Sequence, residues 1–166
     1  MKRGNVSGEI WLEDLYNGHA TNIAILPGDQ IFVSEDTRNF SVMGELAGQG
    51  LVTFPKARLS ALEGITLAGG LNTAAADPKG VFILRDETPA LARVVLNDPK
   101  IKTDKRLVYV FDLTKPDALF KARDMQLRNG DTILVTEAPY TQWTKILNAL
   151  LTTTSAADNI SNVANN

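Results

Sequence analysis

The chain has 166 residues, a formal net charge of −2 and no cysteine, a length that suits one domain with its own core. Its 44% hydrophobic and 22% charged residues are ordinary for a globular protein and exclude disorder over the whole length. Without cysteine there are no disulfides or thiolate metal sites. The absence of a basic excess argues against a nucleic-acid partner.

The sequence contains no continuous apolar segment typical of a transmembrane helix or a signal peptide. No stretch approaches the roughly 18 apolar residues of a standard transmembrane helix. Lys2 and Arg3 stand where a signal peptide would begin, but no apolar run follows them. If the protein is exported, we expect its signal to lie outside this chain.

Taken in chain order, the sequence predicts mostly short strands, because apolar and polar residues alternate in runs bounded by turn residues. One helix interrupts the series. Ser60 and Glu63 have the spacing of a capping box, in which each side chain bonds the other residue's backbone N–H. Gly69 and Gly70 are predicted to end this helix. The predicted strands are residues 8–15, 30–34, 40–46, 81–85, 90–96, 107–113 and 132–136.

A short pattern occurs twice. Residues 25–33 and 126–135 each place an apolar residue, a turn and a Gly-Asp pair before a strand, and 102 residues separate Gly28 from Gly130. An Asp-Leu pair stands upstream of each copy, at residues 14–15 and 112–113. A period of about 100 residues favours tandem copies of one small domain over a solenoid.

The repeated pattern predicts two tight turns. Pro27-Gly28 suits the centre of a type II turn, and Asn129-Gly130 suits a hairpin-like turn. Asp29 and Asp131 are expected to accept hydrogen bonds from backbone N–H groups of these turns. We interpret both aspartates as structural turn residues rather than catalytic ones.

The two copies differ in length, which predicts three parts. Residues 1–37 are interpreted as the closing part of a preceding unit, so Met1 is expected to be a processing boundary. Residues 38–138 would form a complete domain, and residues 139–166 a C-terminal helix with a polar tail.

The C-terminal part carries an apolar stripe at helical spacing. Two interpretations stay open: a helix packed on its own domain or a neighbour, or a helix that faces lipid within an oligomer. The stripe consists of Trp143, Ile146, Leu147, Leu150 and Leu151, whereas Thr144, Lys145 and Asn148 lie away from it.

Several of these segments together resemble a known family. Residues 42–46, 59–71 and 81–85 look like a soluble-ligand-binding β-grasp (SLBB) domain. Residues 108–113 and 127–135 resemble the end of that domain in the Wza-like family of bacterial outer-membrane polysaccharide (capsule) export proteins, and residues 26–33 resemble the same closing motif of a preceding domain. The expected fold is therefore α+β, a β-grasp domain with the tail of another unit and an amphipathic helix.

The resemblance implies a component of a polysaccharide export channel in the periplasm and outer membrane of a Gram-negative bacterium. Its partners would be further copies in a ring of about eight, an octamer, the transported polysaccharide and an inner-membrane polysaccharide co-polymerase or export complex. The stripe headed by Trp143 would face lipid or neighbouring helices, and Thr144, Lys145 and Asn148 would face the lumen.

Two other functions compete with this one. A soluble periplasmic glycan-binding module without pore activity is the alternative. An enzyme has no support, because the sequence holds no Walker loop, no G-x-S-x-G elbow and no H-E-x-x-H motif. We therefore expect no catalytic residues, no metal and no cofactor.

Overall fold

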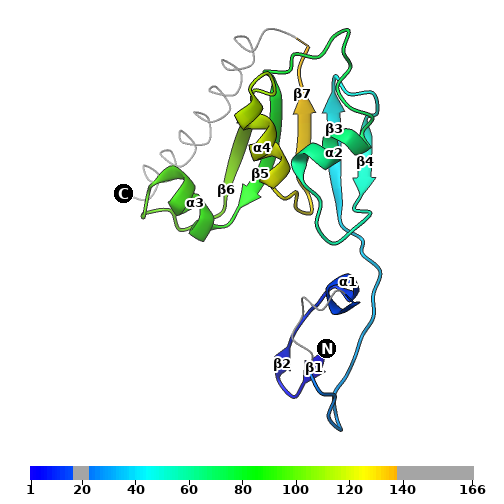
Figure 1. The fold of residues 1–166 in the computed structure, drawn as a ribbon. Helices are drawn as coiled ribbons and strands as arrows, with labels where there is room; N and C mark the ends of the chain where they lie inside the picture. Colours follow the sequence, from blue (N-terminus) through cyan, green and yellow to red (C-terminus); the bar gives the residue numbers. More distant parts are fainter. Residues whose placement is uncertain (17–22, 138–166) are drawn as a thin grey trace, which may run out of the picture.

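The computed structural model describes residues 1–16 and 23–137. A small N-terminal unit precedes a larger body, and an extended segment joins them (Figure 1). The N-terminal unit holds β1 (Lys2–Arg3), β2 (Val6–Ser7) and α1 (Leu12–Tyr16). The body contains β3 (Asn39–Gly44), β4 (Gly50–Thr53), α2 (Ala61–Leu67), β5 (Val81–Glu87), α3 (Pro89–Leu96), β6 (Lys105–Phe111), α4 (Pro116–Asp124) and β7 (Thr132–Val135).

The body is built on a mixed sheet with the strand order β4-β3-β7-β5-β6. The last strand, β7, inserts between β3 and β5. It runs parallel to β3, with Val42 opposite Ile133, and antiparallel to β5, with Ile83 also opposite Ile133. Strands β4 and β6 form the two edges.

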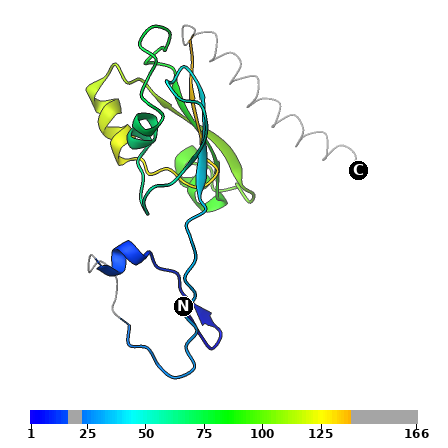
Figure 2. The same ribbon diagram turned by 90° about the vertical axis from the view of Figure 1, so that its right-hand side faces the viewer.

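Helices α2 and α4 cover one face of this sheet, as the two views together show (Figures 1 and 2). The core lies between that face and the helices, because alternate residues of each strand point the same way. Phe40 and Phe54 meet edge to face at 5.5 Å between ring centroids. The other large buried apolar residues of this cluster are Val42, Leu46, Leu59, Ile65, Val81, Ile83, Phe111, Leu127, Ile133 and Val135.

The predicted helix is confirmed as α2, together with its capping box. The N–H of Glu63 donates to the Ser60 hydroxyl at 3.2 Å, and the N–H of Ser60 donates to the Glu63 carboxylate at 2.8 Å. Gly69 and Gly70 follow with positive φ angles. The strands expected at residues 40–46, 81–85, 107–113 and 132–136 are also confirmed, as β3, β5, β6 and β7.

The strand predicted at residues 90–96 is wrong, because this segment is helix α3. Pro89 occupies the first helical turn, where a missing N–H costs little. Asn97 ends the helix in the left-handed conformation with φ of 51°. The run Ala-Leu-Ala-Arg-Val-Val-Leu has no strict alternation, so the flanking residues decide its structure.

Two N-terminal strand predictions are also wrong. Residues 8–15 contain most of helix α1, whose Glu13 and Asp14 suit the positive end of a helix. In residues 30–34 only Gln30 makes a bridge, to Lys2. Strand β4 and helix α4 were not predicted, since β4 has only four residues and α4 lacks a side-chain N-cap.

Candidate functional site

Within residues 1–16 and 23–137, no group of three or more His, Asp or Glu side chains could hold a metal ion. No helix of the same ranges combines the length and the apolarity needed to cross a membrane. The distinctive polar features are instead two arginine–aspartate clusters and the junction between the two units.

The first cluster is built on the turn that leads into β7. The N–H of Asp131 donates to the carbonyl of Arg128 at 3.2 Å, and Gly130 has a φ of 84°, which favours glycine. The Asp131 carboxylate accepts the N–H of Arg128 at 2.7 Å. The Asp131 side chain therefore stabilises the turn by accepting a backbone hydrogen bond within it.

Arg85 of β5 holds this carboxylate from the neighbouring strand. Its Nε and Nη2 donate to the two oxygens of Asp131 at 2.9 and 2.6 Å, and Nη2 also donates to the carbonyl of Gln126 at 2.7 Å. Only 8% of Arg85 and 2% of Asp131 are exposed. A paired fork of this kind is among the stronger hydrogen-bonded geometries in proteins.

Glu87 extends the cluster. Its carboxylate accepts the Tyr109 hydroxyl and the Arg128 guanidinium, both at 2.8 Å, and lies 3.6 Å from Arg85. Burial disfavours the charged form of Glu87, but these hydrogen bonds outweigh it and hold its pKa below the usual range. Burial and the adjacent Glu87 raise the pKa of Tyr109. Glu87 therefore stays ionised and paired at neutral pH.

The second cluster repeats the first in the N-terminal unit. Arg3 Nε and Nη2 donate to the two oxygens of Asp29 at 2.8 and 2.7 Å, and Nη2 also donates to the carbonyl of Ala24 at 2.8 Å. The Asp29 carboxylate accepts the N–H of Leu26 at 2.8 Å. Ala24 stands five residues before Asp29, as Gln126 does before Asp131.

The two turns also share their backbone. Gly28 has a φ of 93°, and the N–H of Asp29 donates to the Leu26 carbonyl at 3.1 Å. Asn129 has no positive φ, so its turn is not the mirror-image hairpin type and resembles the type II turn at Pro27. The Asn129 side chain instead accepts the N–H of Asn39 at 3.0 Å and ties the turn to β3.

A pH titration should report the Arg3–Asp29 clamp. The hydrogen bond from Arg3 and the N–H of Leu26 lower the pKa of Asp29 to about 2, against about 3.9 for a free aspartate. The Arg3–Asp29 ion pair should therefore stabilise the N-terminal unit fully above pH 4. This stabilisation should be lost as the pH falls through about 2, because the carboxylate is then protonated. Carboxyl-detected NMR would measure this pKa, and Arg3→Ala should return it toward the usual value. An Asp29 pKa unchanged by Arg3→Ala would contradict the assignment.

The junction between the two units is a stack on Arg38. Its guanidinium lies 4.2 Å from the centre of the Trp11 ring and 4.5 Å from that of Phe54. Asp36 pairs with it at 2.9 Å. A pocket of about 150 Å³ beside the stack is lined by Trp11, Leu12, Glu13, Asp36, Phe54, Pro55, Lys56 and Ala57. Through Arg38 the stack joins Trp11, which precedes α1, to Phe54, which follows β4.

The predicted site residues fall in two groups. The structure places Pro27, Gly28 and Asp29 in one turn and Asn129, Gly130 and Asp131 in another. The helix residues Trp143, Thr144, Lys145, Ile146, Leu147, Asn148, Leu150 and Leu151 lie outside the described residues.

The sequence analysis missed the arginine partners of both turns. Arg3 precedes its aspartate by 26 positions and Arg85 by 46. No fixed spacing therefore links the pairs along the chain. Only the strand register brings each arginine beside its turn.

Comparison with known proteins identifies the body. A sequence profile of the SLBB domain matches residues 38–135, the span from the start of β3 to the end of β7. The chain belongs to the SLBB domain family. This confirms the expected SLBB domain, and its elements are mixed α+β.

Similar curated proteins carry the domain in longer chains. The Vi polysaccharide export protein VexA/TviF of Salmonella typhi is 27% identical over 135 residues, which cover 81% of this chain and 36% of that protein. The capsule polysaccharide export outer membrane protein CtrA of Neisseria meningitidis is 29% identical over an alignment of 176 positions, which covers 99% of this chain and 44% of that protein. The capsule polysaccharide export protein BexD of Haemophilus influenzae is 23% identical, with 98% and 43% covered.

These relatives bear out the resemblance to polysaccharide export proteins. The chain with its SLBB domain spans less than half the length of the relatives just named. The similarity to CtrA and BexD covers nearly the whole chain, so it includes the N-terminal unit and the segment after β7 as well as the SLBB domain.

Proposed function

We propose that this chain is part of an outer-membrane channel that exports a capsular or exocellular polysaccharide. The observation that carries the proposal is the SLBB domain in a chain whose near-complete length matches proteins named for polysaccharide export. On this proposal the protein is not an enzyme: it provides a passage, and no bond is made or broken. It would work in the periplasm and outer membrane with an inner-membrane polysaccharide export complex.

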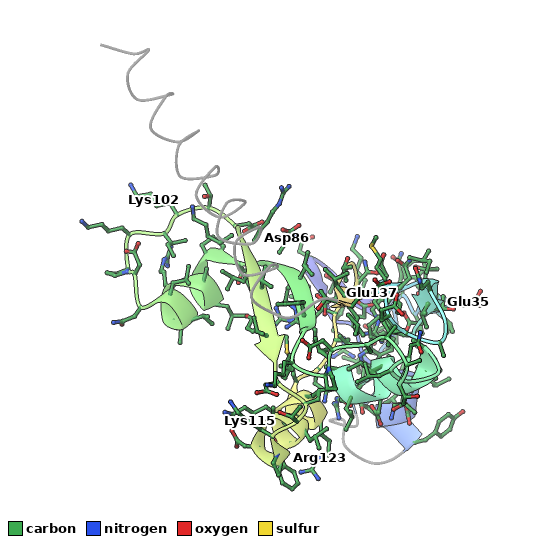
Figure 3. All side chains as sticks on the ribbon, turned by 90° about the horizontal axis from the view of Figure 1, so that it is seen from above. Glu35, Asp86, Lys102, Lys115, Arg123 and Glu137 are labelled. Carbon is green, nitrogen blue, oxygen red and sulfur yellow. The ribbon has the colours of Figure 1, made fainter. Side chains whose placement is uncertain are left out.

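The proposed fold is a β-grasp. Its support is the mixed sheet with the parallel β3–β7 pair at its centre and α2 packed across one face. In this arrangement the chain leaves the central strand β7 at its C-terminal end, close to Glu137, which is labelled in Figure 3. The segment that follows, residues 139–166, is proposed to form the amphipathic helix and its polar tail.

A ring of copies, proposed as an octamer, requires two different surfaces on each copy. The body has exposed apolar side chains at opposite edges of its sheet. Beside the β6 edge lies α3, with Leu91, Val94 and Val95 exposed; at the β4 edge Leu51 is exposed. In Figure 3 Lys102, in the loop before β6, and Glu35, in the segment before β3, lie at opposite sides of the view. Head-to-tail contact between such edges joins unlike surfaces, as a closed ring needs.

In the proposed channel the C-terminal helices of all copies gather in the membrane. Trp143, Ile146, Leu147, Leu150 and Leu151 would face lipid or neighbouring helices. Thr144, Lys145 and Asn148 would face the lumen. A ring of helices with lipid outside and water inside satisfies the helical backbone internally.

Liposome flotation and light scattering on the full chain test the proposal. The chain should float with liposomes and, in detergent, have the mass of a closed oligomer. A variant with Trp143, Leu147 and Leu150 replaced by serine should lose at least about tenfold in lipid partition, since each buried large side chain contributes about 1.5–3 kcal/mol.

The matched control changes only the lumen-facing positions. Lys145→Gln with Asn148→Ser should leave flotation and mass unaltered. A chain that is monomeric in detergent and does not float with liposomes would overturn the channel proposal. Saturable oligosaccharide binding by such a monomer, seen by calorimetry, would favour the soluble glycan-binding alternative instead.

A further inference from the structure

Helix α3 leaves most of its apolar side chains uncovered. It lies in the connection between β5 and β6, and of its residues only Ala92 is buried. Leu91, Val94 and Val95 are 40%, 77% and 51% exposed. Their spacing of three and four positions puts them on one face of the helix. An exposed apolar patch of this kind is typical of a surface that another protein covers.

Basic side chains follow this patch along the chain. Residues 93–106, from the last turn of α3 to the start of β6, hold five basic and two acidic side chains. Their net charge is therefore +3, in a chain whose formal net charge is −2. Lys100 and Lys102 are both exposed. We call Leu91, Val94, Val95, Lys100 and Lys102 the α3 surface.

Helix α1 and the residues before it have the complementary character. Residues 1–37 hold two basic and six acidic side chains, a net charge of −4. Leu12 and Leu15 of α1 are 57% and 46% exposed. Glu9 and Glu13 are exposed as well. We call Glu9, Leu12, Glu13 and Leu15 the α1 surface.

The sheet places these two surfaces at the same end but at opposite edges. Strand β3 starts where β4 ends, since Asn39 is opposite Thr53, and β5 ends where β6 starts, since Glu87 is opposite Lys105. Strands β3 and β5 lie antiparallel on either side of β7, so both places are at one end of the sheet. Helix α3 follows β5 there, beside the edge strand β6. The stack of Trp11 on the body holds α1 there, beside the end of the edge strand β4.

We propose that the α3 surface of one copy docks on the α1 surface of the next copy. This inference rests on the proposed ring and names the surfaces that meet in it. Rotating a second copy about an axis along the strands brings the β6 edge of one copy to the β4 edge of the other. The two surfaces then meet at the same height. Within one copy they cannot meet, because three strands separate the edges.

Charge decides which surfaces pair. Contact between two α3 surfaces would bring lysines together, and contact between two α1 surfaces would bring glutamates together. Contact between unlike surfaces sets the basic side chains against the acidic ones and the apolar residues of α3 against those of α1. Complementary potentials of this kind select the partner and fix the register of an interface.

Charge reversal with rescue tests the contact in the full chain, in detergent at low ionic strength. Glu9→Lys with Glu13→Lys places like charges in the contact. It should raise the concentration needed for assembly, measured by sedimentation, by at least about tenfold. Adding Lys100→Glu with Lys102→Glu to that variant restores opposite charges and should restore assembly.

The matched control reverses two lysines that lie elsewhere on the body. Lys79→Glu with Lys121→Glu changes the net charge as much as Lys100→Glu with Lys102→Glu, and both positions are exposed. This control should assemble like the unchanged chain. Equal weakening by the control would show an effect of net charge alone and would overturn the inference.

Cross-linking reports the contact directly, because the chain has no cysteine of its own. Glu13→Cys with Lys102→Cys, treated with a short bis-maleimide linker, should give a ladder of covalent multimers. Each single variant should remain unlinked. Linked dimers from a single variant would show contact between like surfaces and overturn the inference.

The outcomes separate this contact from the channel proposal. A closed oligomer that floats with liposomes but gives no ladder would overturn the contact and leave the channel standing. A ladder from a chain that does not float would support the contact and overturn the channel. A chain that stays monomeric and unlinked would overturn both.

Discussion

Replacing Asp131 by alanine is expected to lower the free energy of unfolding of the SLBB domain by about 3–5 kcal/mol. The variant leaves the Arg85 guanidinium buried, with its bonds to both Asp131 oxygens lost. It also leaves the N–H of Arg128 without the carboxylate that closes the turn. A buried charge without its partner is far more costly than an exposed one.

Urea unfolding followed by circular dichroism would measure this loss. The matched control is Asp117→Ala, which removes a carboxylate 2.6 Å from Lys121 on α4, with both side chains more than two-thirds exposed. Exposed pairs of this kind contribute only about 0.3–0.5 kcal/mol. Equal losses in the two variants would show that burial of the Arg85–Asp131 pair does not decide its contribution.

Gly44→Ala is expected to destabilise the domain by at least about 3 kcal/mol. Gly44 ends β3 with a φ of 86°, and a Cβ there would stand 1.9 Å from the carbonyl oxygen of Val135. That oxygen also accepts the N–H of Glu45 at 2.9 Å. The backbone would have to separate β3 from β7, the parallel pair at the centre of the sheet.

Gly70→Ala measures the cost of the positive φ alone, without the steric clash expected for Gly44→Ala. Gly70 has a similar φ of 82°, but nothing lies within 4 Å of the added Cβ. Its cost should be only that of the left-handed conformation, about 1–2 kcal/mol. If both variants unfold at the same urea concentration, close approach of β3 and β7 is not what requires glycine at position 44.

Local signals predicted the elements whose structure is decided within a few residues. The capping box at Ser60 and Glu63 identified α2, because both partners lie in one turn of the chain. Alternating apolar residues identified β5 and β6. The run after Pro89 misled, since β-branched Val94 and Val95 suggested a strand while the proline and Asn97 favour a helix.

By itself the sequence determined the α+β class, the helix at residues 61–67 and the two Gly-Asp turns, because hydrogen bonding within each segment sets its conformation. Only the tertiary structure decided that Arg3 and Arg85 hold those turns. Strand register joins residues 26 or 46 positions apart, and no spacing along the chain encodes it. Burial depends in the same way on which strand lies alongside: Ile133 is buried because β7 lies between β3 and β5.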